Sequence, residues 1–261
     1  MKAQIQLQLE RKQPVLGTWS IVANATLAEI ASLAGLEFLI LDLEHGPYDF
    51  GALESAIRAC ESAGSAPLVR VPSLDPSIFQ RVLDLGAHGV VVPQITGRTD
   101  VERAVAYAKY APVGTRGYNP FVRAAAFAGS TGESSGKLQT DFGLVCVIIE
   151  NTAGYAELDQ ILSVSGLDAV YLGTYDISMA LGCNGNTKDP RVLSFVADAG
   201  QRIVSAGKAV GMMVRTQEEI EQALDLGATM LVYGVDAHVI HEAWRQPVEN
   251  FMRIRDGRKK R

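Results

Sequence analysis

The sequence predicts one α/β domain over residues 1–261, folded as a closed (β/α)8 (TIM) barrel. Eight short apolar runs recur along the chain, stretches with the period of a helix separate them, and no segment rich in Gly, Ser and Pro divides the chain. Eight β/α units in one domain favour a closed barrel over an open sheet. A length of 261 residues is also ordinary for a barrel of one domain.

The eight apolar runs predict the strands. Each run is almost continuously apolar, which is typical of parallel strands whose two faces are both covered by helices. In chain order the runs are VLGTWSI (15–21), FLILDLE (38–44), APLVRVP (66–72), GVVVPQI (89–95), LVCVIIE (144–150), AVYLG (169–173), AVGMMVR (209–215) and MLVYGVD (230–236).

The stretches between the runs predict the helices. Apolar residues recur in them at helical spacing, and several end in glycine, as the C-terminus of a helix often does. The segment LDLGA occurs at 83–87 and again at 224–228, which indicates one helix-to-strand turn used twice. The clearest helical stretches are TLAEIASLAG (26–35), PSIFQRVLDLG (76–86), TDVERAVAYAKY (99–110) and TQEEIEQALDLG (216–227).

Composition excludes several classes of partner. The net charge of −5 and the pI near 5.4 leave no basic stripe for phosphate groups, so we expect no nucleic acid partner. The first 14 residues are polar, unlike a signal peptide, and no later apolar run is long enough to span a bilayer. We therefore expect a cytoplasmic protein without a membrane partner. The cysteines show no CxxC spacing, which fits reduced, buried thiols.

Polar side chains gather where the predicted strands end, and in this fold the C-terminal strand ends build the active site. Each of these side chains could instead have a structural role, such as packing for Trp19, helix capping for Asp42 and Asp176, or a loop hydrogen bond for Gln94. Charges at the ends of buried strands are nevertheless costly unless they are paired or bound to a metal. The side chains that meet at this rim are Trp19, Asp42, Glu44, His45, Arg70, Gln94, Glu150 and Asp176.

Two rim carboxylates, Glu150 and Asp176, follow separate strands. Carboxylates suit a hard divalent cation that keeps water and substrate oxygens as its other ligands, so we expect Mg²⁺ or Mn²⁺, with Co²⁺ as a further candidate. Zinc is less favoured because His45 is the one histidine at the rim and no thiol lies there. Glu44 is a candidate to hold a water molecule in the outer shell of the metal.

The lysines argue against imine chemistry. A barrel enzyme that forms a Schiff base needs a lysine inside the barrel, whereas these lysines fall in tails, helices, loops and the opening of the seventh strand. A metal as electron sink, Arg70 as a fixed cation and His45 as proton carrier suit the formation and stabilisation of an enolate. The segments after the last two strands lack a Gly-rich phosphate cup, which favours a substrate without phosphate.

Several motifs together resemble the HpcH/HpaI aldolase family. They follow one another as LDLEHGPYD, VRVP, RVLDLGAHGVVVPQI, GTRGY with RAA after it, VIIEN and YLGTYDIS, from Gly17 to Asp236. The order and spacing of the motifs make the set specific. The resemblance implies a barrel of the phosphoenolpyruvate/pyruvate type and a metal-dependent class II aldolase, which reversibly cleaves a 4-hydroxy-2-oxo acid to pyruvate and an aldehyde.

The resemblance also implies roles for individual residues. Arg70 would stabilise the enolate oxygen. His45 would act as acid and base, oriented by Asp42 and by Asp84 of a neighbouring chain. The implied metal ligands are Glu150 and Asp176, and the implied substrate contacts are Trp19, Gly173 and Thr174.

Two further expectations concern mobile and shared parts of the molecule. Members of the family are typically hexamers, built as trimers of dimers that exchange their last helix, and HEAWRQPVENFMRI (241–254) is the expected helix. The segment 118–137 is rich in Gly, Ser and Ala, and we expect it to act as a lid whose Arg123 meets the aldehyde end of the substrate or a second carboxylate.

The chain departs from the family pattern at two positions. The aldolases usually have Gln two positions before the metal-binding Glu, where this chain has Ile148. They often read Gly-Pro-x-Asp at the second metal ligand, where Thr174 and Tyr175 precede Asp176 here. Both expected metal ligands, Glu150 and Asp176, are retained. The two departures affect which substrate we expect the site to accept.

Other readings stay open. A related carbon–carbon lyase or synthase, citrate synthase-like or acting on a CoA ester, could use the same enolate. A barrel that only binds a partner is a third, and the complete set of charged rim residues argues against it. His238 and His241 are expected to be surface or interface residues, and His88, which precedes the fourth strand, is expected to be structural.

Overall fold

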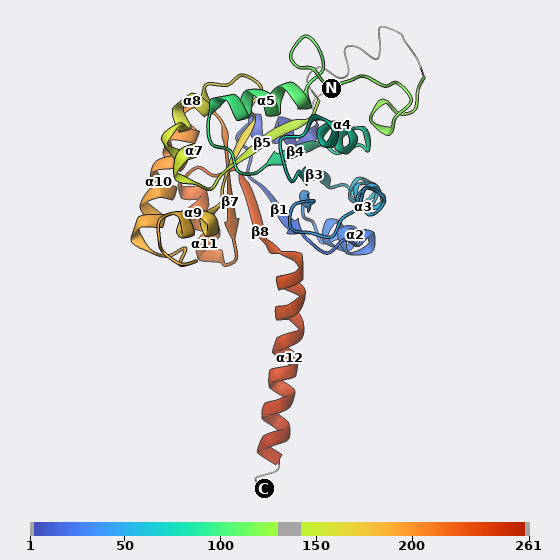
Figure 1. The fold of residues 1–261 in the computed structure, drawn as a ribbon. Helices are drawn as coiled ribbons and strands as arrows, with labels where there is room; N and C mark the ends of the chain where they lie inside the picture. The colour runs from blue at the N-terminus through green and yellow to red at the C-terminus, as the bar shows by residue number, and fades with distance from the viewer. Residues whose placement is uncertain (1–2, 130–141, 259–261) are drawn as a thin grey trace.

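The computed structural model describes residues 3–129 and 142–258, whose centre is a closed barrel of eight parallel strands in chain order (Figure 1). Every strand lies within the apolar run that predicted it, so the predicted TIM barrel is confirmed. The strands are β1 Val15–Ser20, β2 Phe38–Asp42, β3 Ala66–Arg70, β4 Gly89–Val92, β5 Leu144–Ile149, β6 Ala169–Leu172, β7 Ala209–Val214 and β8 Met230–Val235.

Helices surround the barrel (Figure 1). The turn predicted twice at LDLGA is confirmed, because Gly86 and Gly227 both end a helix with positive φ values of 100° and 88°. The described helices are α1 Gln4–Glu10, α2 Ala25–Leu33, α3 Phe50–Ser62, α4 Pro76–Asp84, α5 Arg98–Ala108, α7 Thr152–Ala156, α8 Leu158–Leu162, α9 Thr174–Ala180, α10 Pro190–Ser205, α11 Gln217–Asp225 and α12 Asp236–Arg258, with a 3-10 turn η1 at Arg123–Ala125. None of them is long and apolar enough to cross a membrane.

The apolar core forms two separate clusters. The larger cluster lies between the strands and the surrounding helices, and it includes Val69, Phe79 and Val90. The smaller one fills the inside of the barrel with the opposite side chains of the same strands, such as Leu68 and Val91. This alternation explains why every strand reads as a continuous apolar run, since both of its faces are buried.

Helix α1 closes the barrel at the end where the strands begin. Its Ile5 and Leu9 are buried, at 1% and 6% exposed, and they join the inner cluster beside Val15 and Phe38, the first residues of β1 and β2. The sequence showed this stretch only as polar, because Gln residues stand between its apolar ones. The inside of the barrel therefore opens to solvent only toward the C-terminal strand ends, as far as the described residues show.

Helix α12 stands clear of the barrel. It extends 23 residues from the end of β8, and Figure 1 shows it pointing away from the other elements. Trp244, Val248 and Phe251 follow one another at helical spacing and are 71%, 56% and 61% exposed. A single chain thus leaves an apolar helix face uncovered.

Candidate active site

A cavity of about 240 Å³ opens at the C-terminal ends of the strands. The chain folds the predicted rim residues to one place because parallel strands in a closed barrel all end on the same side. Of the ten predicted site residues, Asp84 and Arg123 lie elsewhere. Those that line the cavity are Trp19, Asp42, His45, Arg70, Glu150, Gly173, Thr174 and Asp176.

The carboxylates of Asp42 and Glu44, at and just after the end of β2, form hydrogen bonds and an ion pair with Arg70. Asp42, which is fully buried, and Arg70 are register partners on β2 and β3. Arg70 Nε donates to Asp42 Oδ1 at 2.8 Å, and Arg70 Nη2 donates to the other carboxylate oxygen. A third contact joins Arg70 Nη1 to Glu44 Oε2 at 3.2 Å. The two carboxylates compensate the buried guanidinium and fix its orientation.

Asp42 also shapes the turn that carries His45. Its Oδ1 accepts hydrogen bonds from the backbone N–H groups of Glu44 at 2.9 Å and His45 at 3.1 Å. The side chain of His45 is 67% exposed, and Nε2 lies 3.9 Å from Glu44 Oε2. Among the described residues no hydrogen bond joins the imidazole ring to Asp42. In the structure Asp42 thus binds the backbone N–H of His45, whereas the expectation from the sequence was that Asp42 orients the imidazole ring.

Glu150 and Asp176 face the same cavity from the ends of β5 and the start of α9. Glu150 Oε1 accepts the backbone N–H of Gln94 at 2.6 Å, and Gln94 Nε2 donates to Glu44 Oε1 at 3.0 Å. Burial raises the pKa of Glu150, and the nearby charges of Asp176 and Glu44 raise it further. Gln94 adopts the left-handed φ of 58° that aims its N–H at the carboxylate.

This donor set fits a divalent metal ion. Asp176 is exposed and has no hydrogen-bond partner within the part of the chain that the structure describes. Glu150 and Asp176 both line the cavity, and like charges on neighbouring carboxylates repel each other unless a cation lies between them. Oxygen ligands of this kind suit Mg²⁺ or Mn²⁺. Because Glu44 already contacts Arg70 and Gln94, it is better placed to orient outer ligands than to bind the ion.

Aromatic side chains form the base of the cavity. The Arg70 guanidinium carbon lies 4.4 Å from the ring centre of Trp19, within cation–π distance. Trp19 is 5% exposed and meets the ring of Tyr171 edge-on, with 5.4 Å between the ring centres. Sequence reasoning missed Tyr171. The signal was its position on β6 two residues after Ala169, which puts both side chains on the inner face of the barrel.

Gly173 leaves room beside the carboxylates. A Cβ atom at this position would lie 2.8 Å from Glu150 Cβ and 3.2 Å from Glu150 Oε2. Tyr175 stands two positions further along at the mouth of the cavity, where its hydroxyl accepts a hydrogen bond from Arg215 Nη1 at 2.8 Å. The side chain of Tyr175 therefore faces solvent and Arg215 as well as the cavity.

Asp84 and Arg123 lie at the other end of the barrel. Asp84 ends α4 and accepts a hydrogen bond from Arg116 at 2.6 Å. Arg123 donates to the carbonyl of Leu85 at 3.2 Å, just before β4, and pairs with Glu61 near the end of α3. A segment that joins a helix to the next strand belongs at this end, so Arg123 does not meet substrate in its own chain. This corrects the expected role of Arg123. Residues 130–137 of the expected lid lie outside the described part of the chain.

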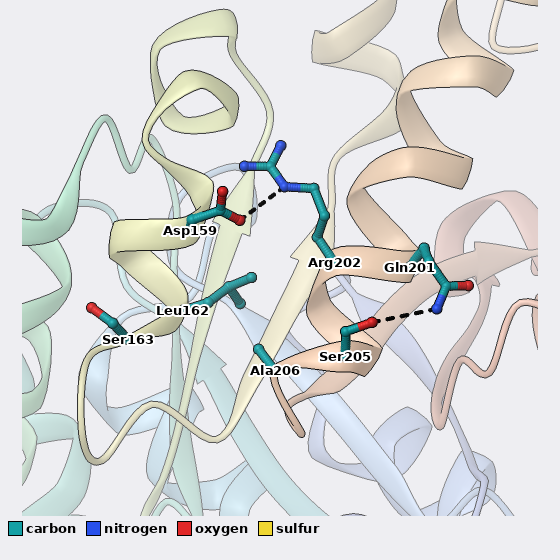
Figure 2. Close-up of a pocket in the computed structure, with 7 residues that line it drawn as sticks. All are labelled: Asp159, Leu162, Ser163, Gln201, Arg202, Ser205 and Ala206. Carbon is teal, nitrogen blue, oxygen red and sulfur yellow. Dashed lines mark hydrogen bonds and ion pairs between the residues drawn. The ribbon is translucent and has the colours of Figure 1, made fainter.

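Two other hollows lie on the described part of the protein. One, of about 410 Å³, lies between α8 and α10 on the outside of the barrel, and Figure 2 shows the residues that line it. Its Arg202 and Asp159 are already paired at 3.0 Å, so no charged group is left for a ligand. The second, of about 690 Å³, adjoins the candidate active site and shares Tyr175 and Met213 with it.

The remaining histidines take structural or surface positions. His88 Nε2 lies 2.8 Å from Glu61 Oε1 at the strand-start end of the barrel. On α12, possible metal-binding atoms of His238, His241 and Glu242 lie within 4.8 Å of one another. Glu242 is already paired with Arg245 at 2.5 Å, and the two histidines are exposed, which fits the surface role expected for them.

Comparison with known proteins identifies the family of the chain. The fold and the cavity define the class as a (β/α)8-barrel enzyme. Residues 16–243 match the sequence profile of the HpcH/HpaI aldolase/citrate lyase family, and the chain belongs to this family of carbon–carbon lyases. The 5-keto-4-deoxy-D-glucarate aldolase of Escherichia coli O139:H28 (strain E24377A / ETEC) is 31% identical over 243 residues, which cover 93% of this chain and 94% of that protein.

Solved structures show the same fold. The structure of the citrate synthase SbnG has a TM-score of 0.86 at 27% identity and covers 97% of this chain and 98% of that chain. A citrate lyase beta subunit from M. tuberculosis, complexed with oxaloacetate and magnesium, has a TM-score of 0.57 at 15% identity and covers 87% of this chain and 93% of that chain. The second likeness is one of fold alone.

Proposed function

We propose that the protein is a metal-dependent class II aldolase, which reversibly cleaves a 4-hydroxy-2-oxo acid to pyruvate and an aldehyde. The observation that carries the proposal is one cavity lined by Glu150, Asp176, Arg70 and His45. Membership of the family and the identity of 31% to a curated aldolase support the same reaction.

Glu150 and Asp176 would hold Mg²⁺ or Mn²⁺, with Co²⁺ as a third candidate. Such an ion, when bound, would act as a Lewis acid at the keto group of the 2-oxo acid. Glu150 directly follows β5, and Asp176 lies in the first turn of α9, which follows the neighbouring strand β6, so both face the open end of the barrel. They leave the other coordination positions to water and to the oxygens of the substrate.

Arg70 would stabilise the negative charge that develops on the substrate oxygen during cleavage. Asp42 and Glu44 hold its guanidinium from two sides, and the ring of Trp19 lies against it. A positive donor that is already fixed does not have to reorganise when charge develops, which is the main source of electrostatic catalysis.

His45 would carry the proton. In cleavage it would take the proton of the C4 hydroxyl, and in synthesis it would return that proton to the new alkoxide. Its ring is exposed at the mouth of the cavity on the turn that Asp42 holds, which suits a group that exchanges protons with solvent. Since Asp42 does not contact the ring, Asp84 of a neighbouring chain is the proposed orienting group.

The adjoining hollow offers space for the aldehyde end of the substrate. It continues from the cavity past Tyr175 and Met213, beyond the carboxylate pair. The 2-oxo acid end would then lie over Trp19 and the aldehyde end toward Arg215.

A second candidate function is a synthase or lyase that uses the same enolate with a different electrophile. It is favoured by the likeness to a structure named as a citrate synthase, at 27% identity over nearly the whole chain. In that case acetyl-CoA or an oxo acid, rather than an aldehyde, would react in the cavity.

Deuterium exchange at the methyl group of pyruvate tests the shared chemistry. With Mg²⁺ or Mn²⁺ present, the proposed aldolase should exchange these protons with solvent, as followed by NMR. Glu150→Gln and Asp176→Asn should each abolish the exchange and Mn²⁺ binding while the far-UV circular dichroism stays unchanged. Incubation with a panel of aldehydes or with acetyl-CoA then separates the two candidate functions. Absence of exchange with every metal would overturn both.

We also propose that α12 is exchanged between two copies of the chain and that the dimers form a hexamer. The apolar face of Trp244, Val248 and Phe251 supports this assembly, because burying it against another copy would contribute hydrophobic free energy that a single chain leaves unused.

A further inference from the structure

The reaction steps proposed for the carboxylate pair, Arg70 and His45 do not use the hydroxyl group of Tyr171. Tyr171 is 4% exposed and lies on β6 with its side chain inside the barrel, at the base of the candidate active site. It is a buried polar group beside the substrate space. In a folded protein, both the oxygen and the proton of such a buried hydroxyl group normally take part in hydrogen bonds.

The hydroxyl oxygen is satisfied, and its proton is not. Trp19 Nε1 donates to Tyr171 Oη at 3.1 Å, so the oxygen is the acceptor in that bond. Among the described residues, the hydroxyl group of Tyr171 donates no hydrogen bond. Burial raises the pKa of Tyr171, which keeps the proton in place at neutral pH. A ligand oxygen in the cavity would satisfy this donor.

The position of the hydroxyl is fixed by its neighbours. Trp19 holds it on one side by the hydrogen bond and the edge-on ring contact. On the other side lies Gly211, where even a Cβ atom would come within 2.8 Å of the tyrosine ring. Trp19 also carries the guanidinium of Arg70 against its ring at 4.4 Å. One aromatic side chain therefore positions both a charged donor and a neutral donor at the same cavity.

The strand beside Tyr171 offers no alternative donor. Its register partner on β5 is Ile148, an apolar side chain that also lines the cavity, two positions before Glu150. The base of the cavity next to the carboxylate pair thus receives its polar contact from β6 and not from β5.

We propose that Tyr171 donates a hydrogen bond to the keto oxygen of the bound 2-oxo acid, beside Arg70. The bond strengthens as that oxygen gains negative charge in the enolate, so Tyr171 contributes to formation of the enolate and not only to binding. This inference rests on the proposed function, because it requires a 2-oxo acid in the cavity.

Tyr171→Phe tests the proposal with two ligands that differ in charge. Pyruvate imitates the ground state, and oxalate imitates the planar enolate with its extra negative oxygen. With Mn²⁺ present, calorimetry should show oxalate binding weakened about tenfold and pyruvate binding weakened much less. Deuterium exchange at the pyruvate methyl group should fall by about the same tenfold. Equal weakening of both ligands, or no weakening, would overturn the assignment.

Tyr155→Phe is the matched control. It removes a hydroxyl that donates to Asp198 at 2.7 Å on the outer helices, and it should leave both affinities and the exchange rate unchanged. Different results refute the proposed function and the role of Tyr171. A wild-type protein that exchanges no methyl protons with any metal refutes the proposed function. A wild-type protein that does exchange them, alongside a Tyr171→Phe variant that matches it, refutes the role of Tyr171 alone.

Discussion

Arg70 makes three contacts that depend on the planar shape of its guanidinium: two to Asp42 and one to Glu44. A lysine would keep the charge but could not hold these carboxylates and face the substrate at once. We expect Arg70→Lys to lower the rate of aldol cleavage by about 10²-fold or more. Arg58→Lys, in an exposed pair with Glu54, is the control and should change little. Near-normal turnover of Arg70→Lys would leave Arg70 with a structural role only.

His45 and Arg70 are separable by two reactions that share an enolate. Aldol cleavage needs a base for the C4 hydroxyl proton, whereas decarboxylation of oxaloacetate reaches the enolate by losing carbon dioxide and needs none. We expect His45→Ala to slow cleavage far more than decarboxylation, and Arg70→Ala to slow both. Both rates are measured at saturating metal. Equal losses for His45→Ala would show that His45 organises the site instead of carrying the proton.

At the scale of elements, Glu61 connects three of them. It lies on α3 and contacts His88, just before β4, and Arg123 in η1. Burial alone would raise its pKa, but the hydrogen bonds from His88 and Arg123 outweigh burial and lower the pKa of Glu61. The stability that these bonds give is complete above the unfolded pKa of Glu, about 4.3, and is lost as pH falls through the lower folded value.

We therefore expect Glu61→Gln to reduce the free energy of unfolding most at neutral pH. The difference from wild type should shrink as the pH falls below about 4, as measured by urea unfolding at several pH values. Glu54→Gln, on the exposed side of the same helix, should have a small effect at every pH. A constant difference for Glu61→Gln across the range would contradict the assignment.

Elements differ in how far the sequence predicted them. All strands were predicted because a strand buried on both faces leaves a continuous apolar run, and the rim residues followed from the common direction of parallel strands. Helix α1 was missed, since burying only Ile5 and Leu9 leaves a largely polar stretch. The misplacement of Arg123 has another cause: composition favoured a lid, although topology puts a helix-to-strand segment at the opposite end. The contacts of the His45 ring depend on a local turn that no pattern encodes.

At the scale of the whole molecule, α12 is the element through which we propose that copies of the chain assemble. We expect the paired substitution of Trp244 and Phe251 by Asp to lower the mass found by light scattering, because charges on this face oppose its burial against another copy. Leu224→Asp, on an exposed position of α11, is the control and should leave the mass unchanged. An unaltered mass for the paired variant would exclude α12 as the assembling element.

The plug that α1 forms has a kinetic consequence. Ile5 and Leu9 join the apolar cluster that fills the barrel below the cavity, so in the described part of the chain molecules enter and leave the cavity from the C-terminal strand ends. In the proposed reaction the pyruvate part lies deepest, so the aldehyde must depart first and pyruvate last. Added pyruvate should then inhibit cleavage competitively against the 4-hydroxy-2-oxo acid, and added aldehyde should inhibit it noncompetitively. The opposite pair of inhibition patterns in initial-rate measurements would mean that pyruvate has a second way out.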